Sequence, residues 1–251
     1  MRKLTIIIPT LNEEFHIDEV IKSASFADEI LIIDSYSSDK TVEIAQSHNV
    51  KILKREFDGF SSQKNYAIER AANDWIFILD ADERIPQPLK EEIMNVLKDG
   101  ESEFVAYDVL CSHIFMNRRM EHSTFKNEWK LRLFNRQFCM HGKKLVHEDM
   151  IINGPKSRLK NHFDHYTYRS YDRFIAKKNH YARLQAEENF KKNKKPSLFH
   201  FIIKPPFRFF NQYILRGGFL DGFPGFASAY INSYGVMTRY IKLWLLHNKM
   251  N

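Results

Sequence analysis

Nine consecutive residues decide the fold of this chain: Trp75-Ile76-Phe77-Ile78-Leu79-Asp80-Ala81-Asp82-Glu83. They begin with a short, uninterrupted apolar run, which predicts a β-strand covered on both faces, as strands of parallel sheets are. Three acids follow that strand directly. Because ligands of open parallel sheets bind beyond the carboxyl ends of the strands, this acidic cluster stands where a functional site is expected.

Three similar strands precede this one, and helical patterns separate them. Strands that alternate with helices indicate βαβ units and a parallel sheet. The sequence therefore predicts an α/β fold with a mostly parallel central sheet. The expected strands are Leu4–Ile8, Glu29–Ile33 and Val50–Leu53, and the helical stretches lie around Phe15–Ile21, Thr41–Gln46 and Tyr66–Ala72.

The chain changes character after the fourth strand. We expect a helix over Leu89–Leu97, strands over Phe104–Cys111 and Trp129–Phe134, and a helix from about Tyr171 to Lys192. Beyond Pro196 the sequence is aromatic and basic. We interpret residues 1–190 as one domain with two parts, 1–100 and 101–190. Residues 191–251 are then a helical C-terminal segment.

Charge is divided unevenly along the chain. The net charge is +7, to which residues 1–153 contribute −6 and residues 154–251 contribute +13. Nine aromatic residues also lie between Phe199 and Phe226. An acidic head and a basic, aromatic tail indicate two functions on one chain, although a merely solvated basic surface would have the same charge.

Composition excludes several classes of protein. With 43% hydrophobic and 27% charged residues, the 251-residue chain has a globular composition. No apolar run approaches the ~20 residues that span a bilayer, and the first residues lack a signal-peptide cleavage site. Two cysteines, Cys111 and Cys139, form no disulfide framework and favour a reducing compartment. We expect an intracellular protein, soluble or peripheral to a membrane.

Asp80 and Asp82 are the strongest candidates for a functional site. Carboxylates at i and i+2 after a buried strand can converge on one Mg²⁺ or Mn²⁺, whose shell substrate phosphates and water complete. The alternative is a solvated acidic turn before the next helix. No Gly-x-Gly-x-x-Gly or Walker lysine loop follows any strand, which disfavours a dinucleotide or P-loop site.

Four motifs together resemble family 2 glycosyltransferases, which are inverting enzymes of the nucleotide-sugar-binding GT-A fold. They are IIIPTLNEE at 6–14, LIIDSYSSDKT at 31–41, QKNYAIERAANDWIFILDADE at 63–83 and KLVHEDM at 144–150. Three further segments are similar to the branch that builds bacterial lipopolysaccharide core, namely RLFN at 132–135, Phe163–Tyr181 and FLDGFPGF at 219–226.

The resemblance implies that residues 1–100 are the nucleotide-sugar-binding half of the domain and residues 101–190 its acceptor and catalytic half. It places the donor site on the strand-end loops. Asp34 is expected to accept a hydrogen bond from a base N–H, which favours uracil and hence a UDP-sugar. Many relatives carry a second acid after Asp34, where this chain has Ser35. The remaining donor contacts implied are Pro9, Thr10, Asn12, Glu13, Lys64, Asn65, Asp80, Ala81 and Asp82.

The resemblance also implies a metal site. We expect Asp82 to be the main ligand, with Asp80 contacting the metal, a metal-bound water or the ribose. His165 is the best-placed third ligand and His162 the second choice, although His165 could equally be a core histidine bonded to backbone. The cation would be Mg²⁺ or Mn²⁺.

Val146-His147-Glu148-Asp149 is where the resemblance places the catalytic base. Glu148 is the first choice and Asp149 the reserve, because a carboxylate can accept the acceptor proton directly. A charged loop without chemical consequence is the alternative. Arg132 and Arg136 flank the end of an expected strand and are candidates for acceptor phosphates.

The expected function is transfer of a hexose, glucose favoured, from a UDP-sugar to a lipid-linked envelope saccharide such as lipopolysaccharide core. The basic, aromatic tail suits the surface of an anionic membrane, which predicts a cytoplasmic enzyme at the inner face of the plasma membrane. The tail could instead hold single-stranded nucleic acid, but the acidic head would repel phosphates. A nucleotidyltransferase is a further alternative, disfavoured because strand one lacks a Gly-rich phosphate loop.

Overall fold

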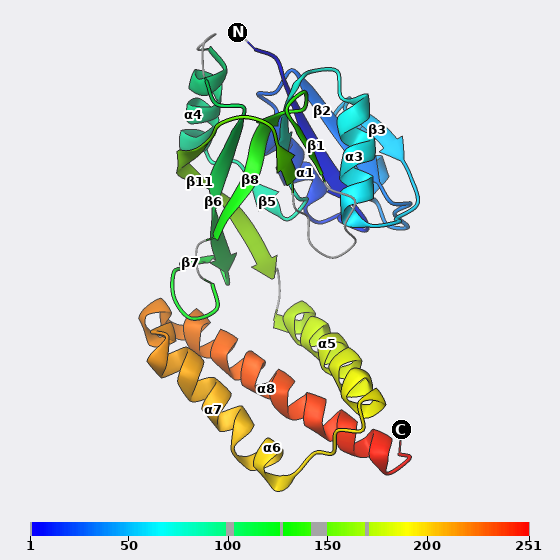
Figure 1. Ribbon diagram of the computed structural model, residues 1–251, viewed down its shortest axis with the longest axis vertical. Helices are drawn as coiled ribbons and strands as arrows, with labels where there is room; N and C mark the ends of the chain where they lie inside the picture. The colour runs from blue at the N-terminus through cyan, green and yellow to red at the C-terminus, as the bar shows by residue number, and fades with distance from the viewer. Residues whose placement is uncertain (1, 99–102, 126–127, 142–149, 169–170, 251) are drawn as a thin grey trace. The chain divides into compact units, whose positions relative to one another are not determined.

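The computed structural model describes residues 2–98, 103–125, 128–141, 150–168 and 171–250 (Figure 1). It divides into two compact units, and each is described here by itself. The first contains residues 1–111 and 128–165, and the second contains residues 112–127 and 166–251.

Parallel strands form one half of the sheet in the first unit. Within the described residues the order along the sheet is β3-β2-β1-β4-β8-β6-β11-β5. The pairs β3–β2, β2–β1 and β1–β4 are parallel, whereas β4–β8, β8–β6 and β11–β5 are antiparallel. The strands are β1 Leu4–Thr10, β2 Glu29–Asp34, β3 Lys51–Lys54, β4 Trp75–Ile78, β5 Glu83–Arg84, β6 Ala106–Phe115, β8 Glu128–Asn135 and β11 Lys156–Tyr168.

Helices cover both faces of this sheet. In β1, Ile6 and Ile8 pack with α1 (Ile17–Ala24) and α4 (Gln87–Lys98) on one face. Ile7 points to the other face, where α3 (Phe60–Arg70) packs against β1 and β2 (Figure 1). Alternate residues of a strand face opposite sides, so a strand covered on both faces is apolar throughout. The remaining helix is α2 (Thr41–Ser47), and β9 (Cys139–His141) and β10 (Met150–Ile152) form a separate antiparallel pair.

The predicted fold class is confirmed. The four strands expected from the first 80 residues are the four parallel neighbours, and their carboxyl ends meet at one edge. The antiparallel strands extend the same sheet and bring β8 and β11 within reach of that edge. One expected helix begins earlier than its apolar spacing indicated, because α3 starts at Phe60, directly after Gly59 with φ of 134°.

Helices dominate the second unit. The long helices α5 (Tyr171–Lys191) and α8 (Gly222–His247) lie side by side (Figure 1). Their apolar contacts form two small cores, one around Phe174 and Ile231 and one around Ala186 and Leu243. The other elements are β7 (Arg118–Met120), α6 (Leu198–Ile202), α7 (Lys204–Phe210), the π-helix η1 (Asn211–Leu215) and the 3₁₀ turn η2 (Gly218–Asp221).

The domain boundary differs from the expected one. We expected the first domain to run to residue 190, but α5 packs on α8 and so belongs to the helical unit. A helical pattern shows only that α5 has one apolar face, and the identity of the surface it covers depends on tertiary packing. Among the described residues, no helix combines the length and apolarity that crossing a bilayer requires.

Glycines shape the FLDGFPGF segment. A Cβ on Gly225 would lie 1.8 Å from the carbonyl oxygen of Gly218, so only glycine permits this approach of α8 to the preceding turn. Asp221 connects the same turn to the residues after β7, because its carboxylate accepts hydrogen bonds from the backbone N–H groups of Glu121 and His122. The segment is therefore accounted for by packing.

Candidate active site

Asp80 lies just beyond the end of β4 and is held between two cations. Arg132 on β8 donates to its Oδ2 at 3.0 Å, and Nζ of Lys64 on α3 lies 4.0 Å from its Oδ1. Burial would raise the pKa of Asp80, but the charges of Arg132 and Lys64 outweigh burial and hold that pKa well below its usual range. Asp80 is therefore ionised at any physiological pH.

Glu83 shares Arg132 with Asp80. The Glu83 side chain is 1% exposed, and Arg132, itself buried, donates to its carboxylate. Burial raises the pKa of Glu83 to about 7 against the opposing charge of Arg132. Arg132 thus serves two carboxylates, which in turn raise the pKa of its guanidinium. It also packs over the ring of Phe163 at 5.0 Å.

Asp82 and His165 form the second part of the site. Nε2 of His165 lies 3.1 Å from Oδ2 of Asp82, and their side chains are 19% and 35% exposed. The pairing of β11 with β5, which sets His165 opposite Glu83, brings the two together. Burial would lower the pKa of His165, but Asp82 raises it to about 10. Burial would raise the pKa of Asp82, and the hydrogen bond with His165 lowers it below its usual value.

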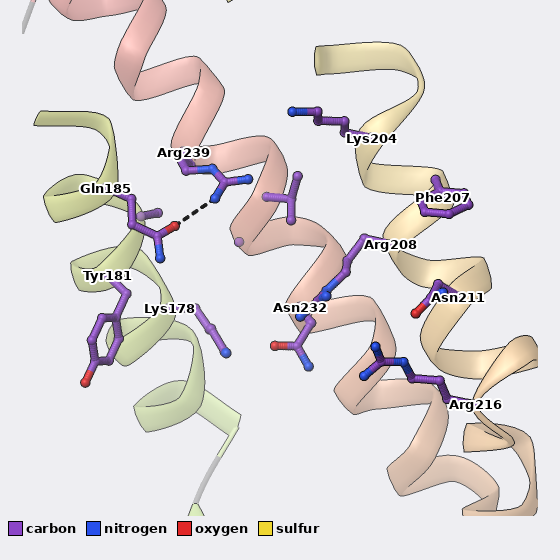
Figure 2. Close-up of a pocket in the computed structure, with 13 residues that line it drawn as sticks. Lys178, Tyr181, Gln185, Lys204, Phe207, Arg208, Asn211, Arg216, Asn232 and Arg239 are labelled. Atoms are coloured by element: carbon purple, nitrogen blue, oxygen red, sulfur yellow. Dashed lines mark hydrogen bonds between the residues drawn. The ribbon is translucent and has the colours of Figure 1, made fainter. Parts of the chain in front are cut away.

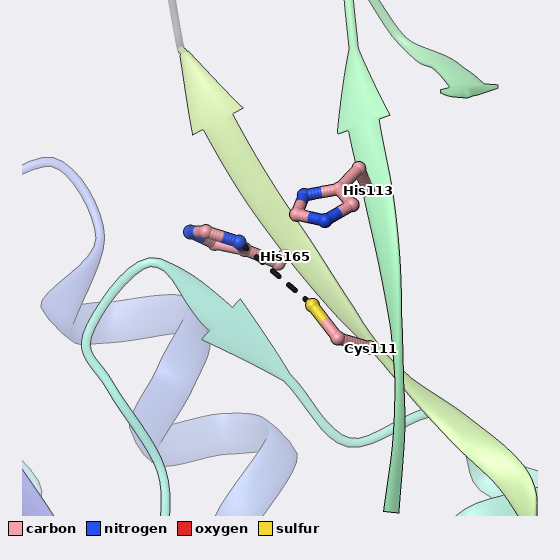
Figure 3. A group of neighbouring side chains, drawn as sticks. All are labelled: Cys111, His113 and His165. Atoms are coloured by element: carbon pink, nitrogen blue, oxygen red, sulfur yellow. Dashed lines mark hydrogen bonds between the residues drawn. The ribbon is translucent and has the colours of Figure 1, made fainter. Parts of the chain in front are cut away.

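The other ring nitrogen of His165 also has a neighbour. Sγ of Cys111 on β6 lies 3.9 Å from Nδ1 of His165 (Figure 3). A histidine that ligates a metal through one nitrogen is commonly oriented by a partner at the other. His165 therefore has the arrangement of a metal ligand. Its Nε2 atom faces Asp82, and its Nδ1 atom faces the thiol of Cys111.

The residues around Asp82 fit a divalent cation. Two adjacent ligands of an octahedral ion with bonds of about 2.1 Å lie about 3 Å apart. The distance of 3.1 Å between Asp82 and His165 is that of a hydrogen bond, and it also matches that separation, so a cation would take the place of the proton between them. Asp80 is already bonded to Arg132, which suits a contact through water better than a direct bond.

Asp34 organises the loop at the end of β2. It is 0% exposed, and its carboxylate accepts hydrogen bonds from Thr10 at 3.2 Å and from both the hydroxyl and the backbone N–H of Ser37. In this structure the carboxylate presents no surface to a nucleobase, because burial and these bonds occupy it. A direct contact between Asp34 and a base therefore stays a prediction.

Asn12 joins the loops after β1 and β2. Its Oδ1 accepts from the backbone N–H of Ser38 at 2.8 Å, and its own N–H donates to Ser37 at 2.9 Å. Asn12 adopts a left-handed backbone with φ of 57°, a conformation that asparagine tolerates. Glu13 continues the link, because its N–H donates to Thr41. Pro9 and Thr10 belong to β1 and lie opposite Ile33 and Asp34 on β2.

A cavity of about 430 Å³ opens beside Asp80. It brings together Lys64 and Asp80, two of the predicted donor contacts, whereas Asn65 lies next along α3. Ala81, between the two aspartates, is buried in the core. The cavity is lined by Phe60, Lys64, Ile78, Asp80, Lys130, Leu131, Arg132 and Met150.

Arg136 does not join this group. Its guanidinium donates to the carboxylate of Asp74 and to the carbonyls of Ile68 and Ala71, at the amino end of β4. β8 runs antiparallel to β4, so Arg132 lies near the carboxyl end of β4, whereas Arg136, which follows the last residue of β8, lies near its amino end. Arg132 therefore meets Asp80, whereas Arg136 does not.

The predicted bases, Glu148 and Asp149, and also His147, lie outside the described residues. Met150, the next residue in the sequence, is described and lines the cavity beside Asp80. His162 lies on β11 with its Nε2 atom 3.5 Å from Asp164, and the contact to Asp82 comes from His165.

Glu83 was not among the site residues predicted from the sequence, and neither were the contacts of Arg132 with Asp80 and Glu83. Glu83 belongs to the acidic run that decided the fold, and its spacing from Asp80 was the available signal. Glu83 is one of the two carboxylates that Arg132 binds, and Asp80 is the other. No local pattern indicates that an arginine 49 residues later in the chain would neutralise Glu83.

Comparison with known proteins finds relatives that are described as glycosyltransferases. An uncharacterised glycosyltransferase of Rickettsia bellii is 29% identical over 96% of this chain and 86% of its own length. The lipopolysaccharide core biosynthesis glycosyltransferase LpsC of Rhizobium meliloti is 26% identical over 97% of this chain and 93% of its own. Among solved structures, glucosyl-3-phosphoglycerate synthase of Mycobacterium tuberculosis, in complex with Mn²⁺, UDP and phosphoglyceric acid, has a TM-score of 0.46. That likeness is 16% identical and covers 68% of this chain and 73% of the other.

The family model described as glycosyl transferase family 2 matches residues 5–180. That span contains the parallel strands, the loops that Asn12 joins, and the group of Asp80, Asp82, Arg132 and His165. With the strand-end carboxylates and the sheet order in agreement, this chain belongs to glycosyl transferase family 2.

Proposed function

We propose that this glycosyltransferase moves a hexose, glucose favoured, from a UDP-sugar to a lipid-linked envelope saccharide such as lipopolysaccharide core, with inversion and with Mg²⁺ or Mn²⁺. Similarity to the lipopolysaccharide core enzyme of Rhizobium meliloti over nearly the whole of both chains supports the acceptor class. Membership of glycosyl transferase family 2 supports a nucleotide-sugar as the donor and inversion of the anomeric configuration during transfer.

The juxtaposition of Asp82 and His165 carries the metal part of this proposal. One carboxylate and one imidazole, with a second carboxylate two residues away, are a ligand set that Mn²⁺ accepts and that Mg²⁺ accepts with more water. The bound cation would neutralise charge that develops on the departing diphosphate. Asp80, kept ionised by Arg132 and Lys64, would orient a metal-bound water or the ribose.

The remaining roles fall to the cavity and its borders. Lys64, 8% exposed at its side chain, would meet a phosphate of the donor at the cost of loosening its contact with Asp80. Asn12 and Glu13 would shape the nucleotide side through the loops they join. Glu148, with Asp149 in reserve, would accept the proton of the acceptor hydroxyl. The position of Met150 in the cavity wall supports this assignment, because it follows Asp149 directly.

Exposed aromatic side chains of the helical unit support a membrane-bound acceptor. Phe199, Phe207 and Phe210 are 55%, 59% and 49% exposed, in a segment that also carries Lys204 and Arg208. Aromatics and cations together favour the interface of an anionic bilayer. We therefore propose that the protein works at the cytoplasmic face of the plasma membrane.

A donor panel tests the proposed activity. UDP-glucose, UDP-galactose, UDP-N-acetylglucosamine, GDP-mannose and UTP would each be added with Mn²⁺, Mg²⁺ or EDTA, and thermal stability measured. A true donor stabilises the folded state by mass action. We expect metal-dependent stabilisation by one UDP-sugar, followed by transfer with inverted anomeric configuration by NMR. Equal stabilisation with and without metal would contradict metal dependence.

Vesicle flotation tests the membrane part separately. The double variant Phe199→Ser/Phe210→Ser should lose recovery with anionic vesicles, whereas Phe57→Ser, a 50% exposed phenylalanine of the first unit, should keep it. Equal recovery of both variants would refute membrane association through this segment.

A further inference from the structure

The helical unit contains a second cavity, of about 760 Å³. Helix α5 forms one wall, α7 and η1 form the other, and α8 forms the floor, with Lys178 and Arg208 reaching toward α8 from opposite sides (Figure 2). Pockets of about 300–1,000 Å³ hold small organic ligands, so this one has room for more than a simple ion.

Among the residues that the structure describes, five cations and no acid line this cavity: Lys178, Lys204, Arg208, Arg216 and Arg239. Among the described residues, none of the five is within ion-pair distance of a carboxylate. Lysine and arginine elsewhere on these helices do form such pairs, as Arg183 does with Glu187 and Lys192 with Glu188. The cavity therefore concentrates positive charge, and no carboxylate within the described ranges of the chain pairs with it.

Neutral contacts hold several of these cations in place. Arg239 donates to Oε1 of Gln185 at 2.9 Å and packs over the ring of Tyr240 at 4.7 Å. Lys204 donates to the hydroxyl of the same tyrosine at 2.7 Å. These contacts fix position without neutralising charge, so the cations are arranged before any ligand arrives.

Two buried groups strengthen the case for a built site. Gln212 is 0% exposed, and in the amide orientation that satisfies its neighbours its oxygen accepts from Nε and Nη2 of Arg208 at 3.1 Å. Nε of Arg239 is buried and has no hydrogen-bond partner within the described part of the chain. A buried donor left without a partner costs free energy, so the Arg239 guanidinium is held at this place by the packing around it and not by a hydrogen bond at Nε.

Burial and mutual repulsion lower the pKa values of two of these cations, Lys178 and Arg208. Burial lowers the pKa of Lys178, and the charge of Arg208 lowers it further. Burial likewise lowers the pKa of Arg208, with Arg216 and Arg239 adding to it. Like charges gathered in a partly buried site destabilise the folded state, and a bound anion would reverse that effect.

We propose that this cavity binds the phosphate of a phosphorylated ligand, as a phosphomonoester or a pyrophosphate. Such groups carry more than one charge on a compact set of oxygens, so a single group can contact several of the five cations. Arginine suits them, because its guanidinium binds two phosphate oxygens at once. The amides of Asn211 and Asn232 add donors at the wall. A carboxylate, with one charge, would leave most of the cations unneutralised.

The phosphate could belong to a soluble molecule or to a lipid headgroup, and both share this chemistry. The proposal does not depend on sugar transfer, because the cavity lies wholly in the helical unit and shares no residue with the site around Asp82. The test of phosphate binding can therefore fail while the proposed transferase activity stands. The proposed transferase activity can likewise fail its own test while phosphate binding stands.

Calorimetry with inorganic pyrophosphate in EDTA tests the proposal on the full-length protein. We expect saturable binding to the wild type and at least about tenfold weaker binding to Arg208→Gln or Arg239→Gln, since each loses a charge-assisted hydrogen bond. Arg183→Gln, which changes net charge equally on exposed α5 surface, should stay within about twofold. Asp82→Asn should bind pyrophosphate like the wild type.

A second variant guards against loss of folding. Lys178→Met/Arg216→Gln leaves the contacts of Gln212 and Tyr240 intact and removes only the ammonium of Lys178 from above the ring of Phe174. It should fold normally, as judged by circular dichroism, and still lose pyrophosphate binding about tenfold or more. Unchanged binding in this variant, or equal losses in Arg183→Gln, would overturn the proposal.

Vesicles separate the two sources of phosphate. Phosphatidylcholine vesicles with phosphatidic acid would be compared with vesicles containing phosphatidylglycerol, whose phosphate is a diester, and with free glycerol 3-phosphate. Preference for phosphatidic acid over both would assign a lipid headgroup, and equal affinity for glycerol 3-phosphate would assign a soluble ligand. Binding to neither phosphatidic acid nor pyrophosphate would overturn the proposal.

Discussion

His165 and Asp82 are 83 residues apart in sequence, yet Nε2 of the histidine lies 3.1 Å from Oδ2 of the aspartate. The antiparallel pairing of β11 with β5 creates this contact. The contact joins Asp82, which follows the parallel strand β4, to His165 on the antiparallel strand β11. The site thus depends on both halves.

Asp82→Asn should abolish metal-dependent turnover. The neutral amide binds a divalent cation far less well, so Mn²⁺ affinity should fall by more than the roughly 10–100-fold that loss of an outer-shell partner costs. Calorimetry with Mn²⁺ and a turnover assay check both. Glu91→Gln, an exposed carboxylate on α4, should behave as wild type. Normal Mn²⁺ affinity in Asp82→Asn would show that the metal binds elsewhere.

Glu148→Gln should lower kcat by about 10²–10⁴ while leaving UDP binding largely intact, because a general base acts on the acceptor and not on the nucleotide. Steady-state kinetics and calorimetry with UDP separate the two effects. Asp149→Asn is the matched comparison and should have a smaller effect. Full activity of Glu148→Gln would exclude it as the base, and a larger loss in Asp149→Asn would transfer the role.

Stability without metal should depend on pH through His165. Its folded pKa of about 10 exceeds its ordinary value of 6.5, so its contribution is complete below about pH 6.5 and is lost as pH rises through about 10. Asp82 must be ionised for this contribution, which sets a lower limit near pH 4. Denaturation in EDTA should show wild type more stable than His165→Gln at about pH 6 and nearly equal at about pH 10. A constant difference across that range would contradict an ion pair.

Arg132→Ala should destabilise the protein by about 3–5 kcal/mol, since it leaves the buried Glu83 carboxylate without its partner. Adding Glu83→Gln should recover part of that loss, because the uncompensated charge is removed with it. Urea denaturation of the two single variants and the double variant measures the coupling. Arg70→Ala, at an exposed arginine of α3, should cost less than about 1 kcal/mol. Additive losses in the double variant would disprove the pairing.

Gly225→Ala should destabilise the helical unit by about 3 kcal/mol or more, because the new Cβ would overlap backbone atoms of Gly218 that cannot move aside. Gly235→Ala on the same helix is the control. A Cβ there meets only the flexible side chain of Lys178 at 3.7 Å, and alanine favours helix by about 1 kcal/mol. Thermal melts followed at 222 nm compare the two. Equal melting temperatures for both variants would contradict the close approach.

The sequence by itself determined the parallel half of the sheet and the edge at which Asp80 and Asp82 lie. The reason is local, because an apolar run followed by polar residues specifies a buried strand and its exposed end without reference to distant segments. Tertiary structure decided which distant side chains arrive there. Arg132 lies beside Asp80 at the carboxyl end of β4, and Arg136 lies near the amino end of that strand, because β8 pairs with β4 in an antiparallel register.

The helical unit shows the same division. Its composition predicted a basic, aromatic segment with helices, but the packing of α5 on α8 placed Lys178 across from Arg208. Charge along a chain is visible in sequence, whereas its convergence on one cavity depends on how helices pack. That convergence, with no carboxylate among the described residues of the cavity lining, is what makes the basic tail a candidate anion site.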